Sequence, residues 1–504
     1  MTKKHHTDAS ANQPSSFDLD YHTIKQLGYQ TVDAICSYIQ TLSTSPTVKC
    51  PHLDECTEMI SQPLPQDGSD PQQVLQECTH FILSNAVHLG HPRFLGWIVP
   101  SATPIGAFAD GLASAMNQNV SISGSGAATA IELCVLNWIK TLIGYPRTAG
   151  GLLVSGGSVG NLTALTIARN VQGKNTCRQK GMNQHTHPLK IYMTNQAHSC
   201  LPRAVDVLGI GLDNIRWIDV DKNYQMDVAD LELKITEDIQ LNDQPLAVVA
   251  SAGTTNTGSI DPLDAIAEVC RTHNLWFHVD AAYGGFATLS PSHKSVFVGL
   301  EKADSVVLDP HKWLYIPYEA GCVLVKNPEH MTSTFQYPAE YIHLDEESST
   351  DINFSERGLQ LSRGFRALKI WMSLKQYGVK QYASMIEQNI ALAQYCANQI
   401  TAMDDFSLCV PPSLSIVCFQ YVPKDLQQSQ DSNVFYLSTL NKAILQKLRR
   451  DKRVILSGTY LADRYVLRVC IINFRTQKED IDLMIDVIGD IGKKEDSRLR
   501  SHRT

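Results

Sequence analysis

Several features that mark common classes of protein are missing from this 504-residue sequence. Its 43 Lys and Arg residues are outnumbered by 51 Asp and Glu residues, so the formal net charge is -8. The basic surplus that is typical of nucleic-acid binders is therefore absent. No apolar run approaches the roughly 20 residues that a membrane-spanning helix needs. We predict neither nucleic acid nor a membrane as a partner.

The 13 cysteines are odd in number and scattered, and no two of them form a CxxC pair. Disulfide frameworks belong mainly to small secreted chains, so we predict free thiols in a reducing compartment. The first residues are polar and lack the apolar stretch of a secretory signal. We therefore predict a disordered tail over 1–16 and a cytoplasmic location. The histidines and cysteines near this end lack metal-ligand spacing, so no metal site is predicted.

The length suggests two to four domains. Apolar residues recur at helical spacing over 17–45, so we predict a helical segment over 17–100 that serves subunit contact. Short apolar runs alternate with helical segments over 101–375, which predicts a large domain with a mostly parallel α/β sheet. A smaller α+β domain is predicted over 376–492, followed by a charged tail over 493–504. The runs expected as strands of the large domain are LLVSGGS, KIYMTN, LAVVASAG, LWFHVDAA, SVVLDP and CVLVKN.

The strongest chemical signal is DPHKWLY, in which Lys312 follows the apolar run SVVLD. Asp280 ends another apolar run, LWFHV, further upstream. Ligands bind at the C-terminal ends of parallel strands, so each residue can cap its own strand over one pocket. A lysine can form a Schiff base with pyridoxal 5′-phosphate (PLP), and an aspartate can keep the pyridine nitrogen protonated. A structural ion pair between the two is the alternative.

A glycine turn, SGGSVGN, lies between a predicted strand and a predicted helix and includes Gly157 and Ser158. Free N–H groups at a helix start favour an anion, and glycines let a phosphate approach the backbone. The turn is not GxGxxG, and the sequence has no GxxxxGK[ST] motif. We therefore predict a phosphate cradle that belongs neither to a dinucleotide fold nor to a P-loop enzyme.

Two further segments follow predicted strands. TNQAHS places His198 where its ring can stack on a cofactor, although a satisfied polar histidine is the alternative. SAGTTNTG places Thr254 and Thr255 where a hydroxyl can bond the phenolic oxygen of a cofactor ring. All these loops leave the C-terminal ends of their strands, so they can meet on one side of the sheet.

The motifs GGSVGN, NQAHS, AGTT, HVDAAYGG and DPHKW occur in an order and spacing that resemble the group II PLP-dependent amino-acid decarboxylases. This family includes the aromatic L-amino-acid decarboxylases, and the resemblance covers roughly residues 20–490. It implies the α/β fold type I of PLP enzymes, which is aspartate-aminotransferase-like, with PLP as the cofactor. It also implies a homodimer whose active site lies at the subunit interface.

The resemblance also implies roles for individual residues. Lys312 resembles the Schiff-base lysine, Asp280 the partner of the pyridine nitrogen, and Ala282 the small residue under the ring. His198 resembles the stacking histidine and Thr254 the residue near the phenolic oxygen. The positions expected to bind phosphate are Gly157, Ser158, Asp309 and His311, with Asp309 standing where the family often has asparagine.

The segment HPRFLGW resembles the family stretch that lines the substrate entrance, which implies contacts from Phe94, Trp97 and Ser101. The stretch SISGSGAATAIE has Gly and Ser where aromatic-specific members commonly carry Trp and Pro. A polar loop over about 330–355 resembles the mobile catalytic loop of the family. Tyr341 aligns with the tyrosine that returns a proton to the substrate after CO₂ leaves, and an ordinary exposed tyrosine is the alternative.

Residues and resemblance together predict decarboxylation of an L-amino acid, with an aromatic substrate favoured, to the amine and CO₂. One alternative is a PLP-dependent aldehyde synthase or another fold type I lyase or aminotransferase. A second alternative is a protein of this fold without catalysis that serves binding or scaffolding. Release of peroxide and ammonia distinguishes the synthase, and failure to take up PLP distinguishes the scaffold.

Overall fold

The computed structural model describes residues 17–49, 53–121, 126–173, 176–182, 187–337 and 352–501. The chain divides into two compact units, Met1–His88 and Leu89–Thr504. Each unit is considered by itself below. The predicted tail over 1–16 and Tyr341 both lie outside the described residues.

The first unit is helical in the residues that the structure describes. Its helices are α1 (Tyr21–Thr41), α2 (Leu53–Ile60) and α3 (Pro71–Ser84). The side chain of Asp20 accepts hydrogen bonds from the first-turn amides of α1, and Asp70 caps α3 in the same way. Such caps fix where a helix begins, so the periodic segment 17–45 forms a shorter helix than the pattern suggested.

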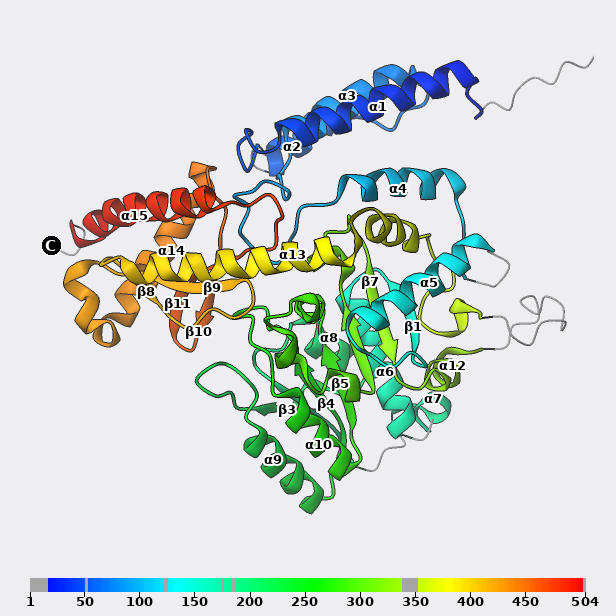
Figure 1. The fold of residues 1–504 in the computed structure, drawn as a ribbon, viewed down its shortest axis with the longest axis vertical. Helices are drawn as coiled ribbons and strands as arrows, with labels where there is room; N and C mark the ends of the chain where they lie inside the picture. Colours follow the sequence, from blue (N-terminus) through cyan, green and yellow to red (C-terminus); the bar gives the residue numbers. More distant parts are fainter. Residues whose placement is uncertain are drawn as a thin grey trace, which may run out of the picture. The chain divides into compact units, whose positions relative to one another are not determined.

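The second unit is built on a seven-stranded sheet in the order β1-β7-β6-β5-β4-β2-β3 (Figure 1). The pairings among β3, β2, β4, β5 and β6 are parallel, whereas β7 pairs antiparallel with both β6 and β1. The strands are β1 (Gly150–Val154), β2 (Leu189–Thr194), β3 (Ile215–Ile218), β4 (Gln244–Ser251), β5 (Trp276–Asp280), β6 (Ser305–Leu308) and β7 (Gly321–Val325). This arrangement confirms the predicted mostly parallel sheet.

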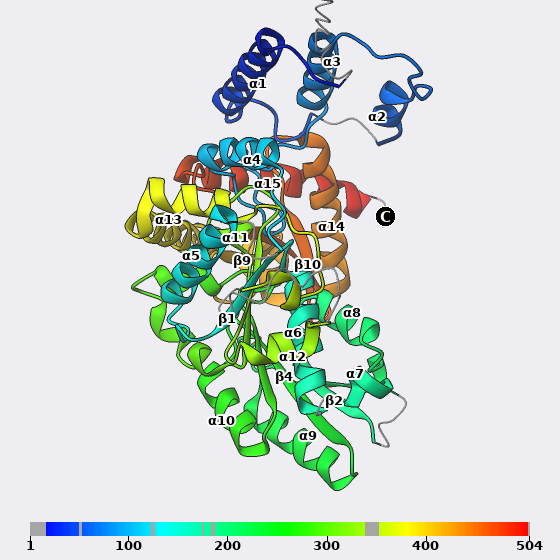
Figure 2. The same cartoon turned by 90° about the vertical axis from the view of Figure 1, so that its right-hand side faces the viewer.

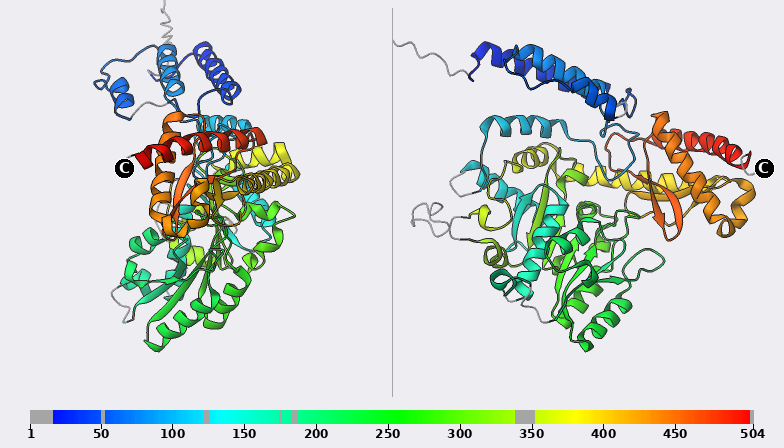
Figure 3. Two further views of the ribbon diagram at one scale, coloured as in Figure 1. Left: turned by 90° about the vertical axis from the view of Figure 1, so that its left-hand side faces the viewer. Right: turned by 180° about the vertical axis from the view of Figure 1, so that it is seen from behind.

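Helices cover both faces of this sheet. Figures 2 and 3 show α6 and α8 on one face and α5 and α10 on the other. Strands enclosed in this way read as continuous apolar runs, and every residue of β1, β5, β6 and β7 is buried. The helices of this part are α4 (Pro104–Met116), α5 (Ala127–Leu142), α6 (Gly157–Gln172), α7 (Thr176–Lys180), α8 (Cys200–Val207), α9 (Val228–Gln240), α10 (Leu263–His273), α11 (Pro310–Trp313) and α12 (Glu329–Phe335).

The C-terminal part contains the predicted α+β structure. A four-stranded antiparallel sheet has the order β10-β11-β9-β8. Its strands are β8 (Phe406–Leu408), β9 (Ile416–Tyr421), β10 (Ser457–Leu461) and β11 (Arg464–Cys470), and helices α14 (Val434–Asp451) and α15 (Lys478–Ser501) pack against it. A separate hydrophobic core underlies this sheet.

A long helix, α13 (Ala367–Ala402), joins the two sheets in sequence. It is not regular throughout, because Gly378 has a φ of 67°. That left-handed conformation is open to glycine at little cost and marks a kink. At the other end of the chain, α15 continues to Ser501, through most of the segment predicted as a charged tail.

Among the described residues, no helix combines the length and the apolar character that a membrane crossing requires.

A buried ion pair ties α5 to the start of α13. Arg363 and Glu132 form an ion pair with both side chains almost fully enclosed, and Arg363 also donates to the backbone oxygens of Val120 and Leu153. We expect Glu132→Ala to lower the free energy of unfolding by about 3–5 kcal/mol, because it leaves a buried guanidinium uncompensated. Urea unfolding followed by circular dichroism measures this loss.

The matched control is the exposed pair of Glu268 and Arg271 on α10. Glu268→Ala removes the same type of ion pair at the surface, where such pairs contribute little. An equal loss in both variants would contradict the structural role of Glu132.

Candidate active site

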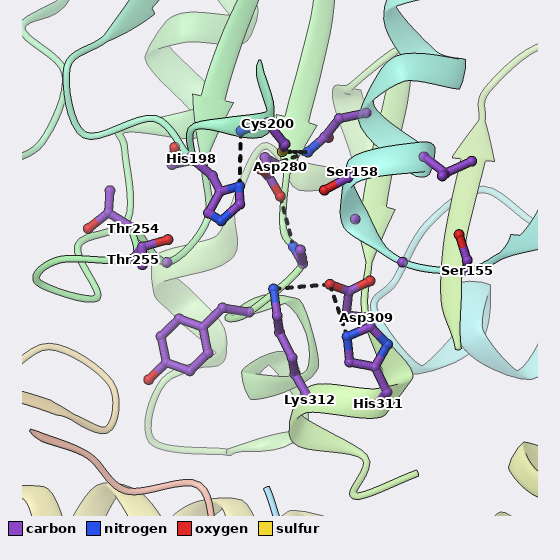
Figure 4. A pocket seen from close by; sticks show the side chains of 18 of the residues that line it. Ser155, Ser158, His198, Cys200, Thr254, Thr255, Asp280, Asp309, His311 and Lys312 are labelled. Atoms are coloured by element: carbon purple, nitrogen blue, oxygen red, sulfur yellow. Dashed lines mark hydrogen bonds and ion pairs between the residues drawn. The ribbon is translucent and has the colours of Figure 1, made fainter. Parts of the chain in front are cut away.

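A cavity of about 350 Å³ lies in the second unit beside the C-terminal ends of the parallel strands (Figure 4). Its lining brings together all the positions for which the sequence predicted cofactor contact. They are Gly157, Ser158, His198, Thr254, Asp280, Ala282, Asp309, His311 and Lys312. Thr255, the second threonine of the predicted pair, lines the same cavity.

Asp280 and Lys312 reach the cavity from neighbouring parallel strands. Asp280 is the last residue of β5, and Lys312 lies on α11, the single turn that follows β6. The ion pair of Lys312 is nevertheless made with Asp309, whose Oδ2 lies 3.0 Å from Nζ. The alternative of a structural ion pair between Asp280 and Lys312 is therefore not what the structure shows.

The charge of Lys312 depends on the two aspartates. Burial works to lower the pKa of its ammonium, but the negative charges of Asp309 and Asp280 outweigh burial, so the pKa is raised. The side chain is thus a charged donor that points into the cavity and is held by a carboxylate three residues away.

Asp280 is held by two hydrogen bonds. Asn161 Nδ2 donates to its Oδ2 at 2.9 Å, and the backbone N–H of Ala282 donates to its Oδ1 at 3.1 Å. Both oxygens therefore have a fixed donor, which sets the plane of the carboxylate. Asp280 is only 8% exposed, so a cation that binds its carboxylate is largely shielded from water.

The glycine turn forms the predicted anion cradle at the start of α6. Gly156 is the N-cap residue, and no described side chain caps this helix end. A Cβ atom at Gly157 would lie 3.0 Å from Asp309 Oδ2 and 3.2 Å from Ala282 Cβ, so a larger residue would fill the space. The sequence therefore leaves helix-start amides uncovered beside a cavity, which suits a phosphate.

Asp309 and His311 form the other wall of this cradle. Asp309 Oδ1 is buried and has no hydrogen-bond partner among the described residues. The backbone N–H of Ala320 donates to His311 Nδ1 at 3.2 Å, so the neutral ring carries its proton on Nε2, which lies 3.6 Å from Asp309 Oδ2. Burial lowers the pKa of His311, and Asp309 opposes this only in part.

His198 enters the cavity as a neutral ring. The backbone N–H of Cys200 donates to its Nδ1 at 3.2 Å, which leaves the proton on Nε2. Burial lowers the pKa of His198, although the carboxylate of Asp280 works against this. Thr254, in contrast, uses its hydroxyl within its own loop, where it lies 2.9 Å from Thr257 Oγ1 and accepts from the Ser259 amide.

The three residues predicted to contact the substrate are not among the residues of this chain that line the cavity. Phe94 is buried, with its ring centroid 5.6 Å from that of Trp97, while Trp97 is 60% exposed. Ser101 is buried and accepts a hydrogen bond from the Arg475 guanidinium. Their predicted contact with substrate stays a prediction.

The cavity also contains residues to which the sequence analysis assigned no role. Asn161, Gln196, Cys200 and Tyr283 all line it. The position of Asn161 could have been predicted from the sequence, because it lies one helical turn after the cradle glycines and so faces the same side of α6. The Cys200 thiol is buried, which raises its pKa to about 11, so it stays protonated.

These residues fit PLP. The cavity offers a lysine for the aldehyde, a fixed carboxylate for the ring nitrogen and an uncovered helix start for the phosphate. The charge of Asp309 beside the cradle is balanced by Lys312. These groups come from the C-terminal end of β5 and from the helix starts that follow β6 and β1.

Comparison with known sequences gives a consistent result. The sequence profile described as the pyridoxal-dependent decarboxylase conserved domain matches residues 54–422. An aromatic-L-amino-acid decarboxylase of Bacillus atrophaeus is 36% identical over 470 residues, which are 92% of this chain and 95% of that protein. An aspartate 1-decarboxylase of Aliivibrio fischeri is 33% identical over 450 residues, covering 81% of each protein.

Comparison with solved structures supports the fold. A crystal structure of Oryza sativa TDC with PLP and tryptamine superposes with a TM-score of 0.88 and covers 95% of this chain and 99% of that chain. The two sequences are 23% identical, so this likeness concerns the fold alone.

Proposed function

The chain belongs to the pyridoxal-dependent decarboxylase family, and on that premise we propose that it decarboxylates an aromatic L-amino acid to its amine. The observation that carries the proposal is one cavity that holds Lys312, Asp280 and the cradle at Gly157. The relative with 36% identity, named as an aromatic-L-amino-acid decarboxylase, supports the substrate class.

PLP, when bound, supplies an electron-accepting ring for the electrons left behind by CO₂. Lys312 would hold its aldehyde, and Asp280 would meet the ring nitrogen. Gly157, Ser158 and His311 would surround the phosphate. Before the Lys312 amine can react it must lose a proton, and the Asp309 carboxylate at 3.0 Å is a direct acceptor for it.

One side of the cavity is formed by the aromatic ring of Tyr283, which packs against Trp313 behind it. The rings of Tyr283 and Trp313 stack with centroids 5.0 Å apart, and the Tyr283 hydroxyl is fixed by Ser415 at 2.7 Å. The neutral ring of His198 contributes a further flat surface. Such walls exclude water and keep the charges of Asp280 and Lys312 effective.

The charges of the lining favour an aromatic over an acidic substrate. Lys312 is the one lysine or arginine among the described lining residues, and it is already paired with Asp309. A second carboxylate on the substrate would lack a cation there, and burying it unpaired is costly. An aspartate substrate, suggested by the relative from Aliivibrio fischeri, is therefore the weaker candidate.

An amine-product screen tests the substrate class. The PLP-loaded protein is incubated with each of the twenty amino acids, DOPA and 5-hydroxytryptophan, and mass spectrometry measures the amines. We expect an aromatic amine as the main product, formed in an amount equal to the CO₂ released. β-Alanine as the main product would favour the acidic substrate instead. An aldehyde with peroxide and ammonia would identify a synthase and contradict proton return by Tyr341.

We further propose a homodimer in the cytoplasm whose copies share the active site. Apolar side chains exposed on one side of α1, among them Tyr21, Ile24 and Tyr29, support a surface that a second copy covers. The described cysteines are not joined in disulfides, which suits a reducing compartment. The substrate contacts proposed for Phe94, Trp97 and Ser101 would then be made across the subunit interface.

A further inference from the structure

A chain of buried side chains leads away from the cavity behind Asp280. Asn161 Nδ2 donates to Asp280 Oδ2, and Asn161 Oδ1 lies 2.8 Å from His278 Nε2. His278 Nδ1 lies 2.8 Å from Ser305 Oγ, which accepts from Trp276 Nε1 at 2.8 Å. We refer to Trp276, Ser305, His278 and Asn161 as the donor relay.

The relay has a single consistent polarity. A carboxylate only accepts, so the amide nitrogen of Asn161 faces Asp280 and its oxygen faces His278. His278 must then carry a proton on Nε2. Burial lowers the pKa of His278 to about 4, so the ring is neutral and its Nδ1 accepts from the Ser305 hydroxyl. Every donor therefore points toward Asp280.

The relay is enclosed. Asn161, His278 and Ser305 are fully buried, and Trp276 is nearly so. His278 stands two residues before Asp280, on the same face of β5, while Ser305 belongs to β6 and Asn161 to α6. Water is not available to replace a missing donor, so the loss of one member leaves the others unsatisfied.

We infer that His278 is a positioning residue for the decarboxylase reaction, which fixes the amide of Asn161 so that Asp280 meets the cofactor ring in one orientation. The inference rests on the proposed role of Asp280. If His278 presented an acceptor at Nε2, the Asn161 amide would turn and place its oxygen against the Asp280 carboxylate. The preorganisation of the ring-nitrogen partner would then be lost.

The test is the NMR resonance of the ring nitrogen in holoenzyme loaded with ¹⁵N-labelled PLP. Asp280→Asn should move this resonance from the protonated toward the unprotonated position. His278→Leu should move it in the same direction and weaken PLP binding about tenfold. His278→Gln, whose amide can still donate toward Asn161, should stay close to wild type.

A matched control separates positioning from general destabilisation. Tyr192, on β2 of the same sheet, donates a buried hydrogen bond to Asp238 at 2.8 Å and lies outside the cavity. Tyr192→Phe should leave the resonance unchanged. Should His278→Leu fail to fold, Ser305→Ala removes only the hydroxyl that sets the tautomer of His278, and the same shift is expected.

The two claims fail differently. If Asp280→Asn moves the resonance but His278→Leu and Ser305→Ala leave both the resonance and PLP binding at wild type, the relay inference is overturned and the proposed function stands. If Asp280→Asn itself leaves the resonance unchanged, Asp280 is not the ring-nitrogen partner, and both claims are overturned.

Discussion

Lys312→Ala is expected to reduce the rate of CO₂ release by at least about a thousandfold. Lys312 is the amine that points into the cavity, and its Nζ is held 3.0 Å from Asp309 Oδ2. Alanine removes both the attachment point for the cofactor aldehyde and the cation that balances Asp309. The measurements are CO₂ release and the visible absorbance of bound PLP, both of which should fall.

Lys234→Ala is the matched control for this variant. Lys234 on α9 is also paired with an aspartate, Asp230, at 2.7 Å, but neither residue lines the cavity. Activity and colour should be retained there. A Lys312→Ala protein that still binds PLP with wild-type colour and releases CO₂ would refute the assignment of Lys312.

Asp280→Asn is expected to slow decarboxylation by about a hundredfold or more while the protein still folds and binds PLP. The neutral amide has the same shape but cannot stabilise a protonated ring nitrogen, so the ring accepts electrons less readily. In the native protein Asn161 Nδ2 donates to Asp280 Oδ2. An asparagine at position 280 can place an amide nitrogen there, which would face the amide nitrogen of Asn161. Single-turnover CO₂ release at matched PLP content measures the chemical step.

The control for Asp280 lies at the opposite end of the neighbouring strand. Asp304 directly precedes β6, is partly buried and accepts a hydrogen bond from the Phe277 amide at 2.8 Å. Asp304→Asn changes a partly buried carboxylate beside the same sheet, away from the cavity, and should leave the rate unchanged. An equal slowing in both variants would mean that Asp280 acts through the fold and not on the cofactor.

The sequence predicted the central strands because their burial makes them continuous apolar runs. β5, for example, is buried along its whole length. The edge strand β3 was missed, because in Ile215–Ile218 only the first and last residues are buried and the run is four residues long. A run of this length cannot be distinguished from a loop by periodicity alone.

The residues of the site were predictable only in part, and the pairings among them were not predictable. The loops after the strands were correctly expected to meet at one edge of the sheet, which the lining of the cavity confirms. The partner of Lys312 proved to be Asp309, since one turn of helix brings residues three apart together. The three-residue spacing of Asp309 and Lys312 in DPHKW could have predicted this ion pair, but the sequence analysis did not consider it.

The donor relay could not have been predicted from the sequence. Asn161 and His278 are 117 residues apart, and their contact depends on how α6 packs on β5. His278 within LWFHV reads simply as one polar residue in an apolar strand. The role of His278 depends on its hydrogen bonds to Asn161 and Ser305, which form only when α6 and β6 pack beside β5.

Borohydride reduction of the PLP-loaded protein, followed by peptide mass spectrometry, identifies the lysine that binds the cofactor. Reduction makes the bond between the cofactor and its lysine permanent, so the modified residue can be identified. We expect the added cofactor mass on Lys312 alone, and no added mass when Lys312 is replaced by alanine. A cofactor found on any other lysine, or on none, would contradict the proposed active site.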